Sequence, residues 1–260
     1  MPAPYSGLVS FDVSADSYSR FMGRFSEPLA TGFANLAGVT AGQQAVDVGC
    51  GPGALTAQLV DRLGSAAVSA VDPSAPFVAA VRERFGEIDV RLGRAEQLPF
   101  PDDSFDVAVA QLVVHFMTDP VAGLAEMARV TRPCGIVAAC VWDHAGGAGP
   151  LSGFWQAVRD LDPGAPDESA LAGAREGHLA QLFEEAGLRR IEAGSLTVSA
   201  GFTTFADWWE PFTLGVGPAG AYVARISEER RAALRAHCEE LLPPAPFSVA
   251  ASAWSVRARP

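Results

Sequence analysis

Short apolar runs alternate with stretches of helical periodicity through the first half of the chain. The apolar runs lie at 44–49, 67–72, 89–95, 105–114 and 135–142. In most of the stretches between them, apolar residues recur every three to four positions, as at Leu55, Leu59 and Leu63. The helices that this spacing predicts cover 54–64 and 75–86, and a third helix lies within 119–135. Apolar strands that alternate with helices pair in parallel and are covered on both faces, so the pattern predicts an α/β fold with a doubly wound sheet.

The pattern changes after Trp142. Glycine and proline are frequent over 145–167, which favours a loop before the next helix. The runs 190–200 and 247–258 alternate between apolar and polar residues, as half-exposed strands at a sheet edge do. An aromatic-rich helical segment, 202–243, separates them. We expect the two strands to pair antiparallel, with the helical segment inserted between them.

The composition excludes several kinds of chemistry. The 260 residues carry a net charge of −11, and all 19 basic residues are arginine. Without lysine there is neither a Schiff-base residue nor a P-loop lysine, which excludes pyridoxal-phosphate enzymes and Walker-type NTPases. An acidic surface repels nucleic-acid phosphates, so we expect no nucleic-acid partner. No apolar run approaches the roughly 18 residues of a membrane span, so we expect no membrane partner.

The cysteines and the N-terminal sequence predict a cytoplasmic protein. None of the four cysteines forms a C-x-x-C pair, and no histidine lies near them at zinc spacing. We therefore expect reduced thiols and no metal site. No positive charge precedes Arg20, and no apolar segment resembles the core of a signal peptide.

A glycine loop follows the first predicted strand, in the stretch VDVGCGPG (46–53). In an open α/β sheet such a loop lies at the carboxyl end of its strand and lets a ligand approach the backbone. Asp72 ends the second predicted strand, about 20 residues after the loop, where a carboxylate can accept both hydroxyls of a ribose. NAD and S-adenosylmethionine both fit these two features.

Asp47, two residues before Gly49, favours S-adenosylmethionine. A pyrophosphate beside this acid would place like charges about 4 Å apart, which costs a few kcal/mol at an effective dielectric constant near 20. S-adenosylmethionine carries a sulfonium and an ammonium group and no phosphate, so a nearby acid is favourable. A role for Asp47 in ordering the loop through hydrogen bonds is compatible with either ligand.

Four blocks of sequence carry a family resemblance. They are AVDVGCGPG (45–53), VDPS (71–74), GRAEQLPFPDDSFDVAVAQLVVHFMTDP (93–120) and RVTRPCGIVAACVWD (129–143). In order and spacing they resemble the class I S-adenosylmethionine-dependent methyltransferases, in particular small-molecule enzymes of the ubiquinone/menaquinone C-methyltransferase type. The resemblance implies a Rossmann-like sheet of seven strands, mostly parallel with an antiparallel last strand, for which 247–258 is suited. It also implies methyl transfer from S-adenosylmethionine to a small-molecule acceptor.

The resemblance and the positions of the strand ends together predict the cofactor contacts. The predicted residues are Tyr18, Arg24, Asp47, Gly49, Cys50, Gly51, Asp72, Pro73, Phe77, Ala95, Glu96 and Gln111. Tyr18 and Arg24 lie in a stretch that resembles the helix closing over the cofactor in related enzymes, and an arginine fork matches the methionine carboxylate. Surface positions on a helix are an equal alternative for both. Arg94 stands where many relatives have an adenine-facing acid, so we expect the Ala95 backbone and the Glu96 side chain to recognise adenine.

Two histidines are candidate general bases. His115 follows the fourth predicted strand and His144 follows the fifth, both at the edge where the methyl group would lie. An imidazole titrates near neutrality and can take a proton from a hydroxyl acceptor. Methyl transfer is an in-line displacement that depends mainly on alignment, so a structural or substrate-contacting role is an alternative for each histidine.

Aromatic residues of the second half are candidates for an acceptor pocket. The predicted substrate-binding residues are Trp142, Trp155, Trp208, Trp209 and Phe212. The last three share a helical spacing with Phe205. Such a stripe either fixes the inserted helix to the sheet or forms the inner wall of a lid over an apolar or aromatic acceptor.

These features divide the chain into four predicted parts. They are an N-terminal helical cap (1–37), a cofactor-binding Rossmann-like core (38–200), a helical lid or substrate insertion (201–245) and the last strand of the core sheet (246–260). The favoured function is methyl transfer to a small molecule. The alternatives are an NAD(P)-dependent oxidoreductase and a protein that binds S-adenosylmethionine without transferring its methyl group.

Overall fold

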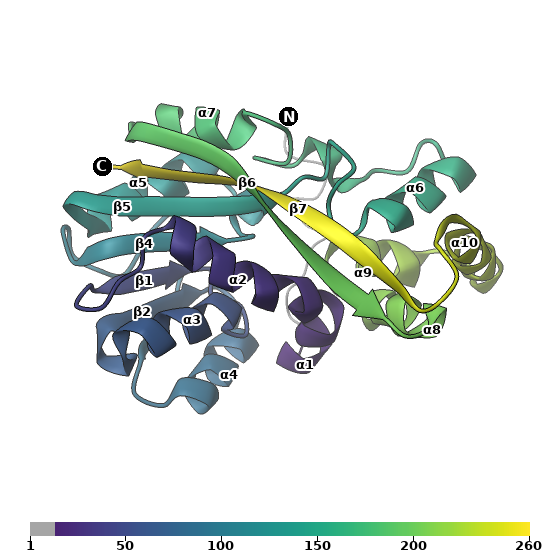
Figure 1. Ribbon diagram of the computed structural model, residues 1–260, viewed down its shortest axis with the longest axis horizontal. Coiled ribbons are helices and arrows are strands. Elements are labelled where there is room, and N and C mark those ends of the chain that lie inside the picture. The colour runs from purple at the N-terminus through teal and green to yellow at the C-terminus, as the bar shows by residue number, and fades with distance from the viewer. Residues whose placement is uncertain (1–13) are drawn as a thin grey trace.

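The computed structural model describes residues 14–260 and confirms the doubly wound sheet (Figure 1). The strands are β1 (Ala45–Val48), β2 (Val68–Asp72), β3 (Asp89–Leu92), β4 (Phe105–Gln111), β5 (Thr131–Trp142), β6 (Arg189–Phe202) and β7 (Phe247–Arg259). Within the described residues they form one sheet in the order β3-β2-β1-β4-β5-β7-β6. The neighbours from β3 to β5 pair in parallel, and β7 runs antiparallel to both β5 and β6. The expected antiparallel last strand is therefore confirmed.

Helices cover both faces of the sheet. They are α1 (Ala15–Tyr18), α2 (Arg24–Leu36), α3 (Ala54–Leu63), α4 (Ala75–Phe85), α5 (Pro120–Val130), α6 (Ser152–Leu161), α7 (His178–Glu185), α8 (Phe205–Trp209), α9 (Gly217–Arg225) and α10 (Glu228–Leu241). Val107 and Val109 of β4 pack with α2 and α3, whereas Ala108 and Ala110 pack with α5 and α7 on the other face. Successive strand residues point to opposite faces, so an apolar strand contributes to two hydrophobic cores at once.

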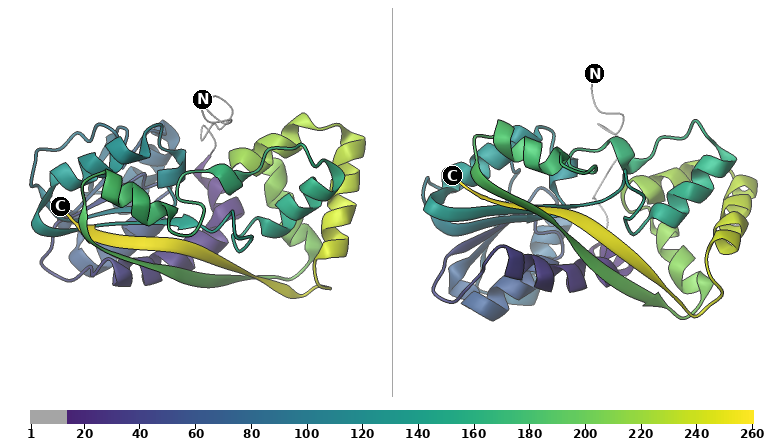
Figure 2. Two further views of the ribbon diagram at one scale, coloured as in Figure 1. Left: turned by 90° about the horizontal axis from the view of Figure 1, so that it is seen from above. Right: turned by 45° about the horizontal axis from the view of Figure 1, so that its top comes forward.

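The β6–β7 pair connects the sheet to a helical group. The two strands pair from Arg189–Arg259 at one end to Phe202–Phe247 at the other, which confirms the expected antiparallel pairing. The pair runs past the carboxyl ends of the parallel strands to α8, α9 and α10, and these helices gather there with α6 (Figures 1 and 2). The segment between the two strands thus lies at the edge where ligands bind in open α/β sheets.

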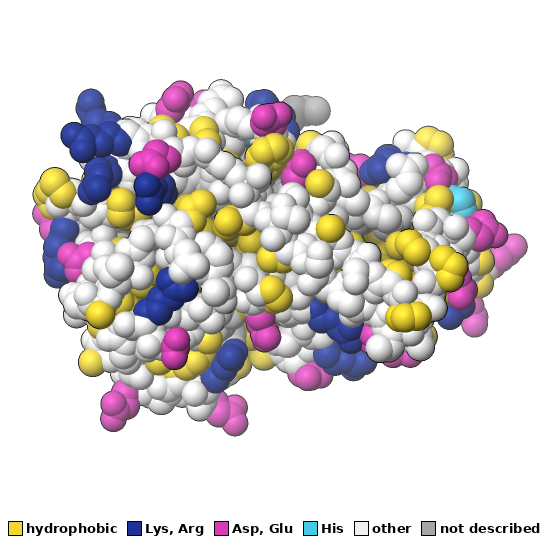
Figure 3. Space-filling view, viewed as in Figure 1, with side chains coloured by type: hydrophobic (Ala, Val, Ile, Leu, Met, Phe, Trp, Pro, Cys, Tyr) yellow, Lys and Arg dark blue, Asp and Glu magenta, His cyan; other side chains and the backbone are white. Residues whose placement is uncertain are grey.

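The sheet's opposite end carries arginines. Arginine side chains gather near the C terminus in Figure 3, where Arg190, Arg257 and Arg259 border a shallow hollow with Glu192. Arg257 pairs with Glu192 at 2.7 Å, and Arg259 donates to the Cys134 carbonyl. Because these arginines lie at the far end of the sheet, they take no part in the site at the strands' carboxyl ends.

Residues 1–13 lie outside the described residues. Two sequence predictions concern them, namely the beginning of the N-terminal helical cap and the expectation that the N-terminus is not a signal peptide. Among residues 14–260, no helix has the length and apolar character needed to cross a bilayer.

Candidate active site

The glycine loop joins β1 to α3 with three glycines in left-handed backbone conformations. The φ angles of Gly49, Gly51 and Gly53 are 71°, 52° and 91°. A Cβ atom on Gly49 would lie 2.5 Å from the Val113 side chain, and one on Gly53 would lie 2.7 Å from Phe85. A Cβ atom on Gly51 would meet nothing within 4 Å. Packing therefore requires glycine at the first and third positions, whereas the middle glycine faces open space and leaves its backbone accessible to a ligand.

Asp72, at the end of β2, holds the loop in place. One carboxylate oxygen accepts a hydrogen bond from the Gly51 amide at 2.8 Å, and the other accepts from the Ser74 amide at 2.8 Å. Burial raises the pKa of Asp72, and these two backbone hydrogen bonds act against that shift. Each carboxylate oxygen has two lone pairs, so both keep capacity for the hydroxyls of a ribose. Of the neighbouring predicted residues, Cys50 is buried and Pro73 is exposed.

Asp47, in β1 just before the loop, is a buried acid with one unpaired oxygen. Its Oδ2 accepts a hydrogen bond of 2.7 Å from the Thr56 hydroxyl, while Oδ1 is buried without a partner. Burial raises the pKa of Asp47 to about 7. A cation beside Oδ1 would offset the desolvation of the charged carboxylate. The residue therefore fits the sulfonium- and ammonium-bearing part of S-adenosylmethionine and disfavours a phosphate.

Tyr18 and Phe77 meet over the end of β2. Their rings pack edge to face with centroids 5.4 Å apart. Burial, and then the charge of Asp72, raise the pKa of Tyr18 to about 12. The structure thus brings these two predicted residues to the side of the loop where Asp72 lies.

Arg24 has other partners than the predicted methionine carboxylate. Its guanidinium forms a two-pronged ion pair with Asp207 of α8, donates to the Gly201 carbonyl at 3.0 Å and lies 5.1 Å from the centre of the Phe202 ring. These contacts tie α2 to the helical group instead of directing the side chain to the glycine loop. The structure gives no support to the predicted role.

Glu96 and Gln111 also make contacts within the protein. Glu96 accepts hydrogen bonds from the amides of Thr118 at 2.7 Å and Asp119 at 3.2 Å, so its carboxylate holds the start of α5. Gln111 donates to the Ser26 carbonyl at 2.9 Å, and its own Oε1 is buried without a partner. Ala95 is buried. One oxygen of Glu96, Oε1, is therefore used at the start of α5, and the adenine contact of Glu96 stays a prediction. Gln111 has an acceptor oxygen to spare at the end of β4.

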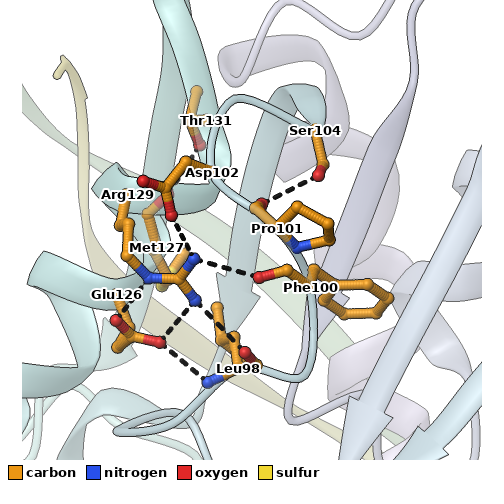
Figure 4. Close-up of polar contacts among 9 residues, drawn as sticks. All are labelled: Leu98, Phe100, Pro101, Asp102, Ser104, Glu126, Met127, Arg129 and Thr131. Carbon is orange, nitrogen blue, oxygen red and sulfur yellow. Dashed lines mark hydrogen bonds and ion pairs between the residues drawn. The ribbon is translucent and has the colours of Figure 1, made fainter.

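Arg129 fixes the loop after β3 that contains Ala95 and Glu96. Its guanidinium lies between Glu126 at 2.6 Å and Asp102 at 2.6 Å (Figure 4). It also donates to the carbonyls of Leu98 and Phe100. This network gives the loop a fixed conformation against α5 in the absence of a helix between β3 and β4.

A narrow cavity lies at the carboxyl ends of β4 and β5. Its walls come from the N-terminal helices, the strand ends and the residues preceding α9, and they include Phe21, Leu112, His115, Trp142, His144 and Val216. Leu112 has a φ of 63°, an unusual conformation for a leucine, at the point where β4 ends. The space open to water-sized molecules is about 30 Å³.

The two predicted histidines face each other in this cavity. Their ring centroids are 5.8 Å apart. Burial, and then the charge of His144, lower the pKa of His115 well below its usual range. His115 Nδ1, His144 Nε2 and Trp142 Nε1 are all buried without hydrogen-bond partners. Unpaired polar atoms are rare in protein interiors, so three of them around one cavity indicate a site that binds a polar group.

Glu168, which was not predicted from the sequence, lies beside His144 and lines the same cavity. It is 3% exposed, and its Oε2 accepts a hydrogen bond of 2.7 Å from Trp155 Nε1. Its Oε1 lies 4.0 Å from His144 Nε2. Glu168 stands in a glycine- and proline-rich stretch with no helical or strand periodicity, so no sequence pattern placed it near the histidines.

Most of the predicted substrate-binding aromatics form the hydrophobic core between the helical group and the sheet. Trp208, Trp209 and Phe212 are buried there, and Phe212 stacks on Phe154 with ring centroids 4.6 Å apart. The expected single helix face is wrong, because α8 ends at Trp209 and a 3₁₀-helix (Glu210–Leu214) follows. Of the five predicted residues, Trp142 is the one among the described cavity walls.

Residues 46–139 match the family described as "Methyltransferase domain". The chain is 38% identical over 112 residues to demethylmenaquinone methyltransferase of Tropheryma whipplei strain Twist, covering 42% of this chain and 46% of the relative. It is 35% identical over 117 residues to malonyl-[acyl-carrier protein] O-methyltransferase of Serratia marcescens, covering 45% of each. The alignments thus span less than half the length of these curated relatives.

A solved structure extends the similarity to the whole fold. Phosphoethanolamine N-methyltransferase 2 of Haemonchus contortus, in complex with phosphomonomethylethanolamine and S-adenosylhomocysteine, superposes with a TM-score of 0.60 at 16% identity. The match covers 96% of this chain and 58% of the other. Taken with the glycine loop, Asp47 and Asp72, these findings show that the chain contains a class I S-adenosylmethionine-dependent methyltransferase domain.

Proposed function

We propose that this protein transfers the methyl group of S-adenosylmethionine to a small-molecule acceptor that is apolar or aromatic in its main body. The observation that supports it best is the position of the histidine cavity relative to the glycine loop. Gly49 packs against Val113, and His115 follows two residues later. The candidate base therefore lies one short turn of backbone away from the loop that binds the cofactor.

The residues around the glycine loop are suited to hold and orient the cofactor. When bound, S-adenosylmethionine supplies a methyl group on a positively charged sulfur. Asp72 offers lone pairs to the ribose, and the unpaired Oδ1 of Asp47 accommodates positive charge. Tyr18 and Phe77 pack together beside Asp72 and shield this region from water. Water exclusion strengthens each of these electrostatic contacts.

The residues that line the histidine cavity supply a free lone pair and apolar walls. The lowered pKa keeps His115 neutral at pH 7, so its lone pair can accept a hydrogen bond from an acceptor, and the same lowering makes it a weaker base than an exposed histidine. Phe21, Leu112 and Trp142 supply apolar walls. Among the relatives, one is named for a demethylmenaquinone substrate, which is in keeping with an apolar ring compound as acceptor.

Acceptor binding requires movement of the cavity walls. The present space of about 30 Å³ holds one or two water molecules, whereas pockets for organic ligands are on the order of 300 Å³ or more. The wall formed by Val216, Gly217 and Pro218 at the start of α9 is the natural part to move. Gly215 and Gly217 have positive φ angles on either side of Val216, so the backbone there is specialised for a turn. This supports the proposed role of 201–245 as a lid. The division of the rest of the chain into a cap (1–37), a core (38–200) and a last strand (246–260) stays a prediction.

Two further parts of the proposal concern the chain's environment. All four cysteines are free thiols, which supports a cytoplasmic location. The acidic net charge of −11 supports a small molecule over a nucleic acid as acceptor.

Calorimetric titration tests the proposal first. We expect S-adenosylhomocysteine to bind and NADH not to bind, and Asp72→Asn to weaken the binding of S-adenosylhomocysteine. Methyl-labelled S-adenosylmethionine then tests transfer to candidate acceptors. Tight NADH binding without S-adenosylhomocysteine binding would overturn the proposal, and cofactor binding with no transfer to any acceptor would favour a protein that binds S-adenosylmethionine for another purpose.

A further inference from the structure

Glu168 is a buried acid with an incomplete set of partners. It lies in the 3₁₀-helix Glu168–Ala170, between α6 and α7, and its side chain is 3% exposed. Burying a carboxylate is costly unless hydrogen bonds or opposite charges replace the lost water. Trp155 Nε1 donates one hydrogen bond to Oε2, at 2.7 Å. Among the described residues, the charged partner nearest to Oε1 is His144, whose Nε2 lies 4.0 Å away.

The described walls of the histidine cavity offer no permanent positive charge to Glu168. They include two histidines but no arginine, and the lowered pKa of His115 keeps that ring neutral. A buried acid at the edge of such a cavity favours a ligand that brings a cation with it. Aromatic rings also attract cations, through the negative charge on their faces. The aromatic walls of this cavity, besides the histidines, are Tyr18, Phe21, Phe116 and Trp142.

The gap between Glu168 and His144 has a width that one ammonium group spans. Oε1 and Nε2 are 4.0 Å apart, which is about 1 Å too far for a hydrogen bond between them. Nε2 is buried without a partner, and it offers a lone pair when the hydrogen of the ring is on Nδ1. An ammonium nitrogen about 2.9 Å from each of two acceptors joins atoms about 4–5 Å apart, because its N–H bonds diverge tetrahedrally.

An ammonium group suits these acceptors better than a hydroxyl group does. A primary ammonium has three N–H donors, whereas a hydroxyl has one and cannot donate to both Glu168 and His144. The unpaired Nδ1 of His115 offers a further lone pair in the same cavity. Hydrogen bonds between a charged donor and a carboxylate are also about twice as strong as those between neutral groups.

We propose that Glu168 and His144 bind an ammonium group of the methyl acceptor, which is therefore an amine with an apolar or aromatic body. The proposal rests on the proposed methyl transfer and adds the charge of the acceptor to it. Glu168 supplies the opposite charge, His144 supplies a second hydrogen-bond acceptor, and the aromatic walls surround the rest of the molecule. Glu168 thus determines specificity, because a neutral alcohol of the same shape leaves the buried acid without a cation.

Calorimetric titration of the protein saturated with S-adenosylhomocysteine measures this preference. The probes are phenylalkylamines of increasing chain length and the phenylalkyl alcohols of the same lengths, at about pH 7.5, where alkylamines are protonated. We expect amines to bind about 10- to 100-fold more tightly than the matching alcohols.

The variant Glu168→Gln assigns the preference to the carboxylate. Its amide oxygen can still accept the hydrogen bond from Trp155, so the packing around the side chain is retained. We expect the amines to lose their advantage over the alcohols, with unchanged affinity for S-adenosylhomocysteine. The control is Glu184→Gln, the same change at an exposed position on α7, which should keep the wild-type preference.

The outcomes for the amine and for the methyl transfer are separate. Alcohols that bind as tightly as their amines, or no amine binding below about 10 mM while S-adenosylhomocysteine binds, overturn the amine acceptor. A Glu168→Gln protein that binds S-adenosylhomocysteine and keeps the preference overturns the role of Glu168. If that variant does not fold, the comparison of amines with alcohols in the wild type decides. Failure of the wild type to bind S-adenosylhomocysteine contradicts the proposed function instead.

Discussion

The Asp47 carboxylate accepts a 2.7 Å hydrogen bond from the Thr56 hydroxyl through one oxygen and buries the other without a partner. Thr56 belongs to α3, the helix that follows the glycine loop, so this hydrogen bond joins the strand before the loop to the helix after it. The residue that discriminates between cofactors therefore also fixes the shape of the loop. The two roles that the sequence left as alternatives are compatible, because they use different oxygens.

Asp47→Asn should stabilise the protein without ligand and weaken cofactor binding. The pKa of Asp47 is raised to about 7 by burial, so the folded state holds its proton more tightly than the unfolded chain does. The protonated Asp47 therefore stabilises the folded state. This stabilisation is complete when the pH is below 3.8, the ordinary pKa of an aspartate, and is lost as the pH rises through about 7. Removing the charge should recover on the order of 1–4 kcal/mol above pH 7, measured by urea unfolding at about pH 6 and about pH 8.

The affinity for the cofactor should change with pH in the direction opposite to the stability. S-adenosylmethionine binding should strengthen in the wild type as the pH rises through about 7, because the Asp47 carboxylate then ionises. In Asp47→Asn we expect binding about 10- to 100-fold weaker at pH 8 and independent of pH in this range. Calorimetric titration gives both quantities. A wild-type affinity that is flat with pH, or equal in the variant, would remove Asp47 from the cofactor site.

The glycines of the loop should separate into a packing and a binding position. Gly49→Ala brings a methyl group to 2.5 Å from Val113 and also carries the strain of a φ of 71°, so we expect about 2–4 kcal/mol of destabilisation. Gly51→Ala meets no atom within 4 Å and should cost about 1 kcal/mol, from the φ of 52° alone. Its methyl group enters the open space over the loop, so the variant should fold and bind S-adenosylhomocysteine more weakly. A folded Gly51→Ala protein with wild-type affinity would place the ligand elsewhere.

The sheet could be predicted from the sequence because each strand and helix has a periodicity of its own. The apolar runs predicted at 44–49, 67–72, 105–114 and 135–142 fall on observed strands, although β4 ends at Gln111, three residues before the predicted end. The glycine loop and Asp72 meet as expected. Contacts between segments far apart in the chain could not be predicted in this way. No local pattern distinguishes Glu168 from a surface glutamate or shows that Asp207 is the partner of Arg24, since both facts depend on how loops and helices pack.

The ion pair between Arg24 and Asp207 gives a direct test of the sequence-based role of Arg24. If the guanidinium serves only to tie α2 to α8, Arg24→Met and Asp207→Asn should have the same small effect. Both side chains are partly exposed, at 40% and 26%, so we expect at most about 1 kcal/mol of destabilisation from either. S-adenosylhomocysteine affinity should be unchanged in both. A large loss of affinity in Arg24→Met that Asp207→Asn does not share would restore Arg24 as a ligand of the methionine carboxylate.

His115 should make the protein less stable in acid. Burial and the neighbouring His144 lower its pKa well below the usual 6.5, so the unfolded chain takes up a proton as the pH falls while the folded protein does not. The free energy of unfolding is therefore unaffected by His115 above about pH 6.5. Below that pH it falls by up to about 1.4 kcal/mol per pH unit, because only the unfolded chain binds the proton. His115→Gln should remove this acid sensitivity, measured as the difference in unfolding free energy between about pH 7.5 and about pH 5.5.

His237 provides a control of opposite sign. It lies on α10, and hydrogen bonds to Asp160, and then to Glu240, raise its pKa above 6.5. The protonated His237 therefore stabilises the folded protein below pH 6.5, and this stabilisation is lost as the pH rises through the raised pKa. Because His237→Gln removes a stabilisation that exists only in acid, the variant should be slightly more sensitive to acid. If His115→Gln instead left the acid sensitivity of the wild type intact, the pKa of His115 in the folded protein would lie near its usual 6.5 and would not be lowered by burial.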